Sequence, residues 1–305
     1  MTTLVFGHQN PDTDSITSAI VMADLQKKIG NDAKACRLGD INKETQFILD
    51  YFKLEAPALI TEVAEKTDVI LVDHNEFGQS VKGIEKAIIK MVVDHHRIAN
   101  FQTAEPLFFR AEPVGCTGTI LYKMYLENGI EIDPKIAGLM ASAIVSDSLL
   151  FKSPTCTSAD EKACRELAKI AELDIEVYGL EMLKAGTDLS DYNAGQLLGI
   201  DAKVFPMGTA KVEIAQINTV SIDDMMTRKE ELEAQMETLI KEKDLNLFLA
   251  VITDILNSNS QIIALGNRTD LVEKGFEIKL ENNTALLEGV VSRKKQIVPV
   301  MDRIA

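Results

Sequence analysis

A basic surface, a long apolar run and paired cysteines are all missing from this sequence. Lysine and arginine number 32 against 47 aspartate and glutamate residues, and the resulting formal charge of −15 repels nucleic-acid phosphates at long range. The longest apolar stretch, 136–151, is interrupted by Asp147, and the N-terminus has no basic segment leading into an apolar one. We therefore predict no nucleic-acid partner, no membrane span and no export.

The cysteines are too scattered for a zinc cage or a disulfide framework, because none of them forms a C-x-x-C pair. They are Cys36, Cys116, Cys156 and Cys164. Reduced thiols and a cytoplasmic location are the expectation. The apolar share of 46% and the charged share of 26% are those of an ordinary globular protein.

The first half of the sequence alternates strand-like and helical patterns. Apolar runs at 3–7, 33–38, 68–73 and 90–94 are separated by segments that we expect to be helical, including one between the last two runs. This rhythm predicts an α/β fold in which a mostly parallel sheet is flanked by helices. From residue 115 to about 184 the pattern becomes helical.

A polar stretch at 187–193 precedes a different pattern, so we predict a domain boundary near residue 188, with one large α/β domain as the alternative. The remainder predicts a smaller α/β domain with a mixed sheet. Its expected elements are a hairpin turning at 207–208, a long charged helix at 222–243, strands at 247–255 and 261–266, and a C-terminal strand at 289–300.

All four histidines lie in the first third of the chain, and each stands beside an aspartate at the end of an apolar run. The carboxyl ends of parallel strands meet at one edge of a sheet, where ligands bind. We therefore expect these side chains to gather at one rim: His8, Asp12, Asp14, Asp73, His74, Asp94, His95 and His96. Asp147 is a further candidate, since an acid inside a buried apolar helix needs a partner.

Clustered carboxylates repel one another unless cations neutralise them. Asp12, Asp14, Asp73 and Asp147 carry four negative charges, which two divalent ions would balance, while His8 and His95 add neutral ligands. A mixed nitrogen and oxygen shell suits manganese or cobalt better than calcium, and zinc is compatible by ligand type. Asp73, at the end of a central strand, is the best candidate to bridge both ions.

Each of these residues also has a simpler interpretation. Asp12 could cap the helix that begins near Thr13, Asp73 and Asp94 could form turns, and Asp147 could accept hydrogen bonds from neighbouring serines. The basic segment 292–296 could be a solvated turn. Taken together, these interpretations leave unexplained why every histidine falls at a strand end.

Five motifs occur in order along the chain: GHQNPDTDS (7–15), VDHN (72–75), VVDHHR (92–97), SAIVSDS (142–148) and SRKKQ (292–296). Together they resemble the family II inorganic pyrophosphatases, the manganese- or cobalt-dependent members of the DHH phosphoesterase superfamily. The resemblance covers essentially the whole chain. It implies a metal-binding, catalytic DHH domain at 1–187, a DHHA2-like substrate-binding domain at 188–305, and a homodimer.

The resemblance also implies roles for individual residues. One metal ion would be held by His8, Asp12 and Asp73, and the other by Asp14, Asp73, His95 and Asp147. The implied phosphate contacts are His96, Lys203, Arg293 and Lys294.

Two such cations would acidify a bridging water and clamp phosphoryl oxygens, so the expected reaction is hydrolysis of inorganic pyrophosphate to two phosphates, with the substrate lying between the two domains. Magnesium could arrive with the substrate. The alternatives are an exopolyphosphatase or another DHH phosphoesterase, and a catalytically silent metal-binding protein. A DHH phosphodiesterase needs a histidine motif in its second domain, and no histidine follows His96.

Overall fold

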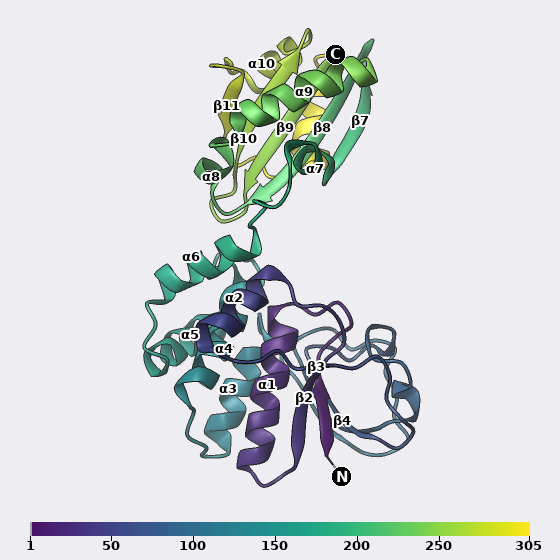
Figure 1. The fold of residues 1–305 in the computed structure, drawn as a ribbon, viewed down its shortest axis with the longest axis vertical. Coiled ribbons are helices and arrows are strands. Elements are labelled where there is room, and N and C mark those ends of the chain that lie inside the picture. The colour runs from purple at the N-terminus through teal and green to yellow at the C-terminus, as the bar shows by residue number, and fades with distance from the viewer. Residues whose placement is uncertain (1) are drawn as a thin grey trace. The chain divides into compact units, whose positions relative to one another are not determined.

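The computed structural model describes residues 2–305 (Figure 1). It divides into two compact units, of which the first ends at Gly186 and the second begins at Thr187. Among the described residues, no helix combines the length and the apolar character that a membrane span needs.

The first unit is built on six parallel strands in the order β3-β2-β1-β4-β5-β6. Their bounds are β1 (Thr3–Phe6), β2 (Ala33–Arg37), β3 (Ala58–Leu59), β4 (Asp68–Val72), β5 (Ile88–Asp94) and β6 (Phe108–Ala111). The predicted parallel sheet is confirmed. Because β1 pairs with β2 on one side and with β4 on the other, the chain reverses its direction of growth here, and such a switch point leaves a crevice at the carboxyl ends of the strands.

The described part of the first unit also contains the helices α1 (Thr13–Lys28), α2 (Lys43–Phe52), α3 (Thr117–Glu127), α4 (Pro134–Ser148), α5 (Ser158–Ile170) and α6 (Ile175–Gly186). α1 begins where the Asp12 side chain accepts a hydrogen bond from the Ser15 amide, at 3.0 Å. α4 is buried on nearly every side, as its apolar sequence predicts, and it packs beside α1 and α3 (Figure 1).

The helix expected between β4 and β5 is absent, and that prediction was wrong. The connection carries two short 3₁₀ turns instead, η1 (Phe77–Gln79) and η2 (Ile84–Lys86). Gly83 lies at φ +88°, and a Cβ atom there would approach the carbonyl oxygen of Val63 to 2.6 Å. The chain therefore has to turn at this glycine, which ends any continuous helix.

The second unit contains a mixed sheet, as predicted. Its strand order is β11-β10-β9-β8-β7, in which β8 and β9 pair in parallel and the other pairs are antiparallel. The strands are β7 (Ala202–Met207), β8 (Ala210–Thr219), β9 (Leu247–Asp254), β10 (Asn259–Gly266) and β11 (Thr284–Leu287). β9 is buried along its whole length and sends alternate side chains into two apolar clusters, one on each face of the sheet.

Helices cover both faces of this sheet. On one face lie α7 (Ala194–Gly199), α8 (Ile222–Met226) and α9 (Lys229–Lys243), of which α9 crosses the strands in Figure 1. On the other lie α10 (Asp270–Phe276) and α11 (Val298–Asp302). The single charged helix predicted at 222–243 is in fact two, since the chain breaks near Arg228, whose guanidinium donates to the carbonyl oxygens of Leu189 and Tyr192.

The C-terminal strand predicted at 289–300 was also wrong. The segment forms a π-helical turn, η3 (Arg293–Ile297), followed by α11. Ser292 caps the turn by accepting from the amide of Lys295, at 3.3 Å, and Gln296 Oε1 accepts from the amides of Val291 and Ser292, each at 3.0 Å. These local side-chain bonds occupy the amides that a strand would pair with a neighbour.

Candidate metal centre

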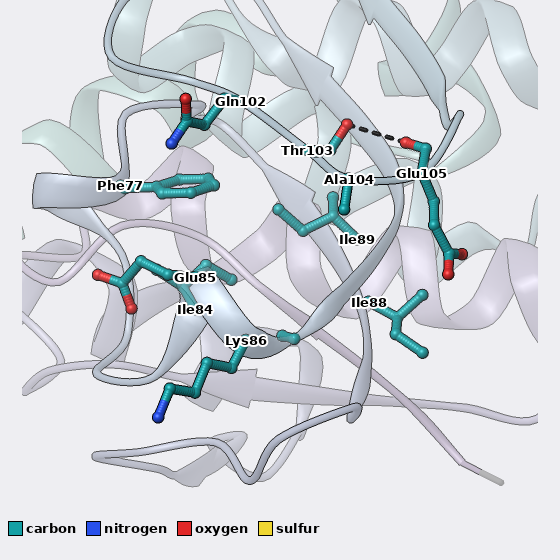
Figure 2. A pocket seen from close by; sticks show the side chains of 11 residues that line it. Phe77, Ile84, Glu85, Lys86, Ile88, Ile89, Gln102, Thr103, Ala104 and Glu105 are labelled. Carbon is teal, nitrogen blue, oxygen red and sulfur yellow. Dashed lines mark hydrogen bonds between the residues drawn. The ribbon is translucent and has the colours of Figure 1, made fainter.

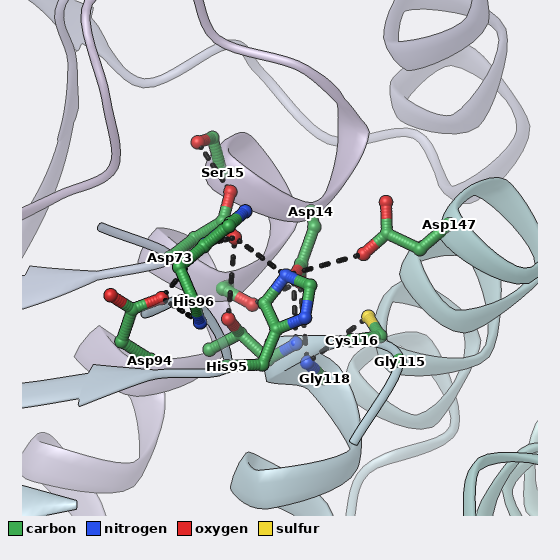
Figure 3. A network of polar contacts seen from close by, with 12 residues as sticks. Asp14, Ser15, Asp73, Asp94, His95, His96, Gly115, Cys116, Gly118 and Asp147 are labelled. Carbon is green, nitrogen blue, oxygen red and sulfur yellow. Dashed lines mark hydrogen bonds and ion pairs between the residues drawn. The ribbon is translucent and has the colours of Figure 1, made fainter. Parts of the chain in front are cut away.

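Three adjacent parallel strands deliver the predicted ligands to one edge of the sheet. His8 follows β1, Asp73 follows β4 and His95 follows β5, while Asp12 and Asp14 begin α1. Asp147 reaches the same edge from the last turn of α4 (Figure 3). The structure thus brings all six predicted ligands together, and their role as ligands stays a prediction.

Asp73 lies at the centre of this group, with its two carboxylate oxygens facing opposite ways. Oδ2 is 3.4 Å from His8 Nε2, and Oδ1 is 3.3 Å from His95 Nε2. The side chain is 1% exposed, and the hydroxyl of Ser15 donates to Oδ2 at 2.7 Å. One oxygen thus faces His8 and the other faces His95, which is the arrangement that a carboxylate shared by two ions requires.

Among residues 2–305, three groups of side chains have ligand atoms within 4.8 Å of one another. The first matches one predicted set: His8, Asp12 and Asp73. The other two are Asp73 with His95 and His96, and Asp14 with Cys116 and Asp147. His95 Nε2 joins the last two groups, because it lies 3.9 Å from both Asp14 Oδ2 and Asp147 Oδ2.

The simpler interpretations hold in part. Asp12 does cap α1, yet its other oxygen lies 3.5 Å from His8 Nε2. Asp147 does not satisfy its carboxylate with neighbouring serines: within residues 2–305, its Oδ2 is buried without a hydrogen-bond partner. A buried carboxylate oxygen left in this way is costly, and a cation is the partner that would satisfy it.

The crowded carboxylates shift one another's protonation. Burial, and then the charge of Asp73, raise the pKa of Asp14 to about 7. Burial, and then the charge of Asp14, raise the pKa of Asp147 well above its usual range. This four-carboxylate, two-imidazole donor set fits two divalent cations, which would remove the repulsion without protonating the acids.

The histidines hold protons where the cations would bind. Burial alone would lower the pKa of His8, but hydrogen bonds with Asp12 and Asp73 outweigh it and raise the pKa to about 10. Burial would likewise lower the pKa of His95, but the hydrogen bond with Asp73 and the charge of Asp14 outweigh it and raise the pKa to about 9. In the metal-free protein, imidazolium ions therefore supply the positive charge that faces Asp73.

His96 and Asp94 form a pair at the margin of the centre. Asp94 Oδ1 accepts from the His96 amide at 3.0 Å and lies 2.9 Å from His96 Nδ1, and this hydrogen bond raises the pKa of His96. Asn75 donates to the other Asp94 oxygen at 2.6 Å. The His96 side chain is half-exposed, and the ring contacts Asp94 through Nδ1 and not through Nε2. His74 is buried instead, and its two ring nitrogens form hydrogen bonds with the Val72 carbonyl oxygen and the Ser80 hydroxyl.

The predicted phosphate contacts of the second unit share one corner of it. The Arg293 guanidinium is buried and donates to the Asp201 carboxylate, at 2.7 Å, and to the carbonyl oxygen of Ile214, at 3.1 Å. Ile214 pairs with Lys203 across β7 and β8, and Lys294 follows Arg293 in η3. Lys203 and Lys294 are exposed. Phosphate binding by these three residues stays a prediction.

Sequence reasoning missed several residues that contact the predicted ligands, among them Ser15, Thr117 and Asn75. The hydroxyl of Thr117 donates to Asp73 Oδ1 at 3.4 Å, and its amide donates to Asp14 Oδ2 at 2.7 Å. The available signal was the glycine- and threonine-rich run 114–119 at the start of α3, whose amides could bind an anion. The anion they bind here is the protein's own carboxylate.

A cavity of about 200 Å³ in the same unit has a different character (Figure 2). It is lined by η2, the start of β5 and the loop 102–105. Apolar side chains such as Phe77, Ile84 and Ile89 alternate there with charged and polar ones, Glu85 and Gln102 among them. None of the predicted ligands lines it. The chemistry of the unit therefore belongs to the rim at the strand ends.

Comparison with known proteins follows the same division of the chain. Residues 2–144 match the model of the DHH family, N-terminal domain, and residues 180–304 match that of the DHHA2 domain. The manganese-dependent inorganic pyrophosphatase of Bacillus subtilis (strain 168) is 60% identical, over 98% of this chain and 97% of its own.

Two solved structures share the architecture. A Methanococcus jannaschii protein assigned to the family II inorganic pyrophosphatases is 39% identical, with a TM-score of 0.62 over 99% of both chains. An exopolyphosphatase-related protein from Bacteroides fragilis is 12% identical, with a TM-score of 0.51 over 99% of this chain and 90% of its own, and that likeness concerns the fold alone.

Proposed function

The chain belongs to the family II, manganese-dependent inorganic pyrophosphatases, and from this premise we propose that it hydrolyses inorganic pyrophosphate to two phosphates with two manganese ions per chain. The observation that carries the proposal is the arrangement around Asp73, whose oxygens face His8 on one side and His95 on the other. Cobalt is the alternative ion, and magnesium would arrive with the substrate.

In this proposal His8, Asp12 and Asp73 hold one ion, and Asp14, Asp73, His95 and Asp147 hold the other. Bound manganese would lower the pKa of a water molecule and neutralise charge on the phosphoryl oxygens. The two histidines give up their protons when they bind the ions, and the four carboxylates then remain ionised.

The remaining proposed residues bind and orient the substrate. Asp94 fixes the His96 ring and favours its protonated form, so His96 can hold a proton at Nε2 for the leaving phosphate. Arg293 offers a planar guanidinium to phosphoryl oxygens, and Lys203 and Lys294 offer mobile point charges. A homodimer and a cytoplasmic location complete the proposal; the four free cysteines support the latter.

An assay of phosphate release tests the proposal directly. Protein with manganese should release phosphate faster from pyrophosphate than from long-chain polyphosphate, and chelation should abolish the reaction until manganese is restored. Faster release from polyphosphate would instead indicate an exopolyphosphatase. Release from neither substrate would leave a metal-binding protein without this activity.

Manganese affinity should rise with pH between about 6 and 8.5, because the ions displace protons from their ligands. For each proton that an ion displaces, its affinity should rise about tenfold per pH unit. His8 and His95, with pKa values of about 10 and about 9, stay protonated across this range in the metal-free protein. Below the pKa of Asp14, about 7, a further proton must leave, so the dependence should steepen there. Calorimetric titration in buffers of different ionisation enthalpy counts the protons, and binding without proton release would contradict this prediction.

A further inference from the structure

One turn of the chain contacts three of the proposed ligands at once. We call residues 115–119 the 115–119 turn; it comprises Gly115, the N-cap Cys116 and the first three residues of α3, and it lies beneath Asp14 in Figure 3. The amides of Thr117 and Gly118 donate to the two oxygens of Asp14, at 2.7 and 3.2 Å. The Thr117 hydroxyl donates to Asp73, and the sulfur of Cys116 belongs to the group that contains Asp147.

Asp160, from the first turn of α5, holds this turn from the other side. It is fully buried, and it accepts from the Gly115 amide at 2.8 Å and from the Thr119 hydroxyl at 2.6 Å. These two donors flank the amides that bind Asp14. A Cβ atom at Gly115 would lie 2.9 Å from Asp160 Oδ2, so the approach depends on the missing side chain.

We propose that Asp160 is a positioning residue for the metal-binding carboxylate of Asp14. By fixing both ends of the 115–119 turn, it keeps two backbone amides aimed at the Asp14 oxygens, and Asp14 is therefore ordered before an ion arrives. The inference rests on the proposed function, since it takes Asp14 as a manganese ligand. Residues that orient metal ligands in this way typically contribute 10- to 100-fold to metal affinity.

Asp160 also has a purely structural role, which the test must separate. With Thr157 it forms the capping box of α5: its carboxylate accepts from the Thr157 amide and hydroxyl, at 2.8 and 2.6 Å. Two single hydroxyls therefore donate to the same carboxylate, one from the 115–119 turn and one from the cap of α5. Removing each in turn gives a matched pair, Thr119→Val and Thr157→Ala.

Titration of metal-free protein with manganese alone distinguishes the two roles. Thr119→Val should lower the affinity for one of the two manganese ions about tenfold or more and leave the affinity for the other within about twofold of the parent value. Thr157→Ala should lower the melting temperature without changing either affinity. Asp160→Ala should combine both effects, and Thr119→Val carries the test if that variant does not fold. Parent-like binding of both ions by Thr119→Val, or equal weakening by Thr157→Ala, would overturn the inference. A parent protein that binds no manganese would contradict the proposed function instead.

Discussion

Replacing Asp73 with asparagine should lower the rate of pyrophosphate hydrolysis by about a thousandfold or more and abolish tight binding of both manganese ions. Residues that merely orient a metal ligand contribute 10- to 100-fold, and a carboxylate shared by two ions should contribute more. Asparagine is the suitable replacement, because Asp73 lies at φ +57° and asparagine accepts this left-handed conformation. Its amide can also keep the hydrogen bond with Ser15.

The measurements for Asp73→Asn are the turnover number and the number of manganese ions bound per chain. Asp254→Asn is the control, since Asp254 is a buried carboxylate of the second unit that bonds to the backbone of its own turn, at Leu256 and Asn257. This control should keep both ions and the activity. If Asp73→Asn still binds two manganese ions tightly, the proposed bridging role of Asp73 is contradicted.

Arg293→Lys should lower kcat/KM by about a hundredfold while leaving manganese binding unchanged. Removing one preorganised donor to a developing oxyanion commonly has effects of this size. An ammonium group cannot reproduce the two-pronged geometry with which a guanidinium binds phosphoryl oxygens. All the proposed metal ligands belong to the first unit, so their affinity for manganese should not respond.

The structural bonds of Arg293 require their own control. Its guanidinium also donates to Asp201, so a loss of activity could reflect a loosened corner of the second unit. Asp201→Asn removes the charge of this partner but keeps an acceptor, and it should retain activity within a few-fold. If Asp201→Asn and Arg293→Lys lose the same activity and the same thermal stability, then Arg293 stabilises the fold and does not bind the substrate.

The strand ends of the first unit were predictable because two simple patterns coincide there. Short, mostly apolar segments mark β1, β4 and β5, and each is followed within two residues by a histidine or an aspartate. Parallel pairing then forces these side chains to one edge. The family resemblance added a prediction that periodicity could not supply, namely which residues would share an ion.

Contacts that depend on backbone geometry were out of reach. Gly115 and Asp160 are 45 positions apart, and nothing in the sequence marks an amide that donates to a distant carboxylate. The segment 289–300 was predicted as a strand because its apolar residues resemble one, whereas Ser292 and Gln296 bond to nearby amides and stabilise a helical turn. Arg293 is also buried in this turn, and its tertiary contacts outweigh the preference of the neighbouring apolar residues for a strand.

The left-handed backbone of Asp73, at φ +57°, favours a short polar side chain at the position that follows β4. Most side chains carry a cost of about 1–2 kcal/mol in that conformation, and aspartate and asparagine are among the few that adopt it readily. Glutamate has the same charge, but it would meet the backbone penalty and extend its oxygens one methylene farther from the bend. Glutamate adopts this conformation elsewhere in the chain, at Glu172 and Glu277, so the bend favours aspartate without excluding glutamate, and the length of the side chain decides between the two acids.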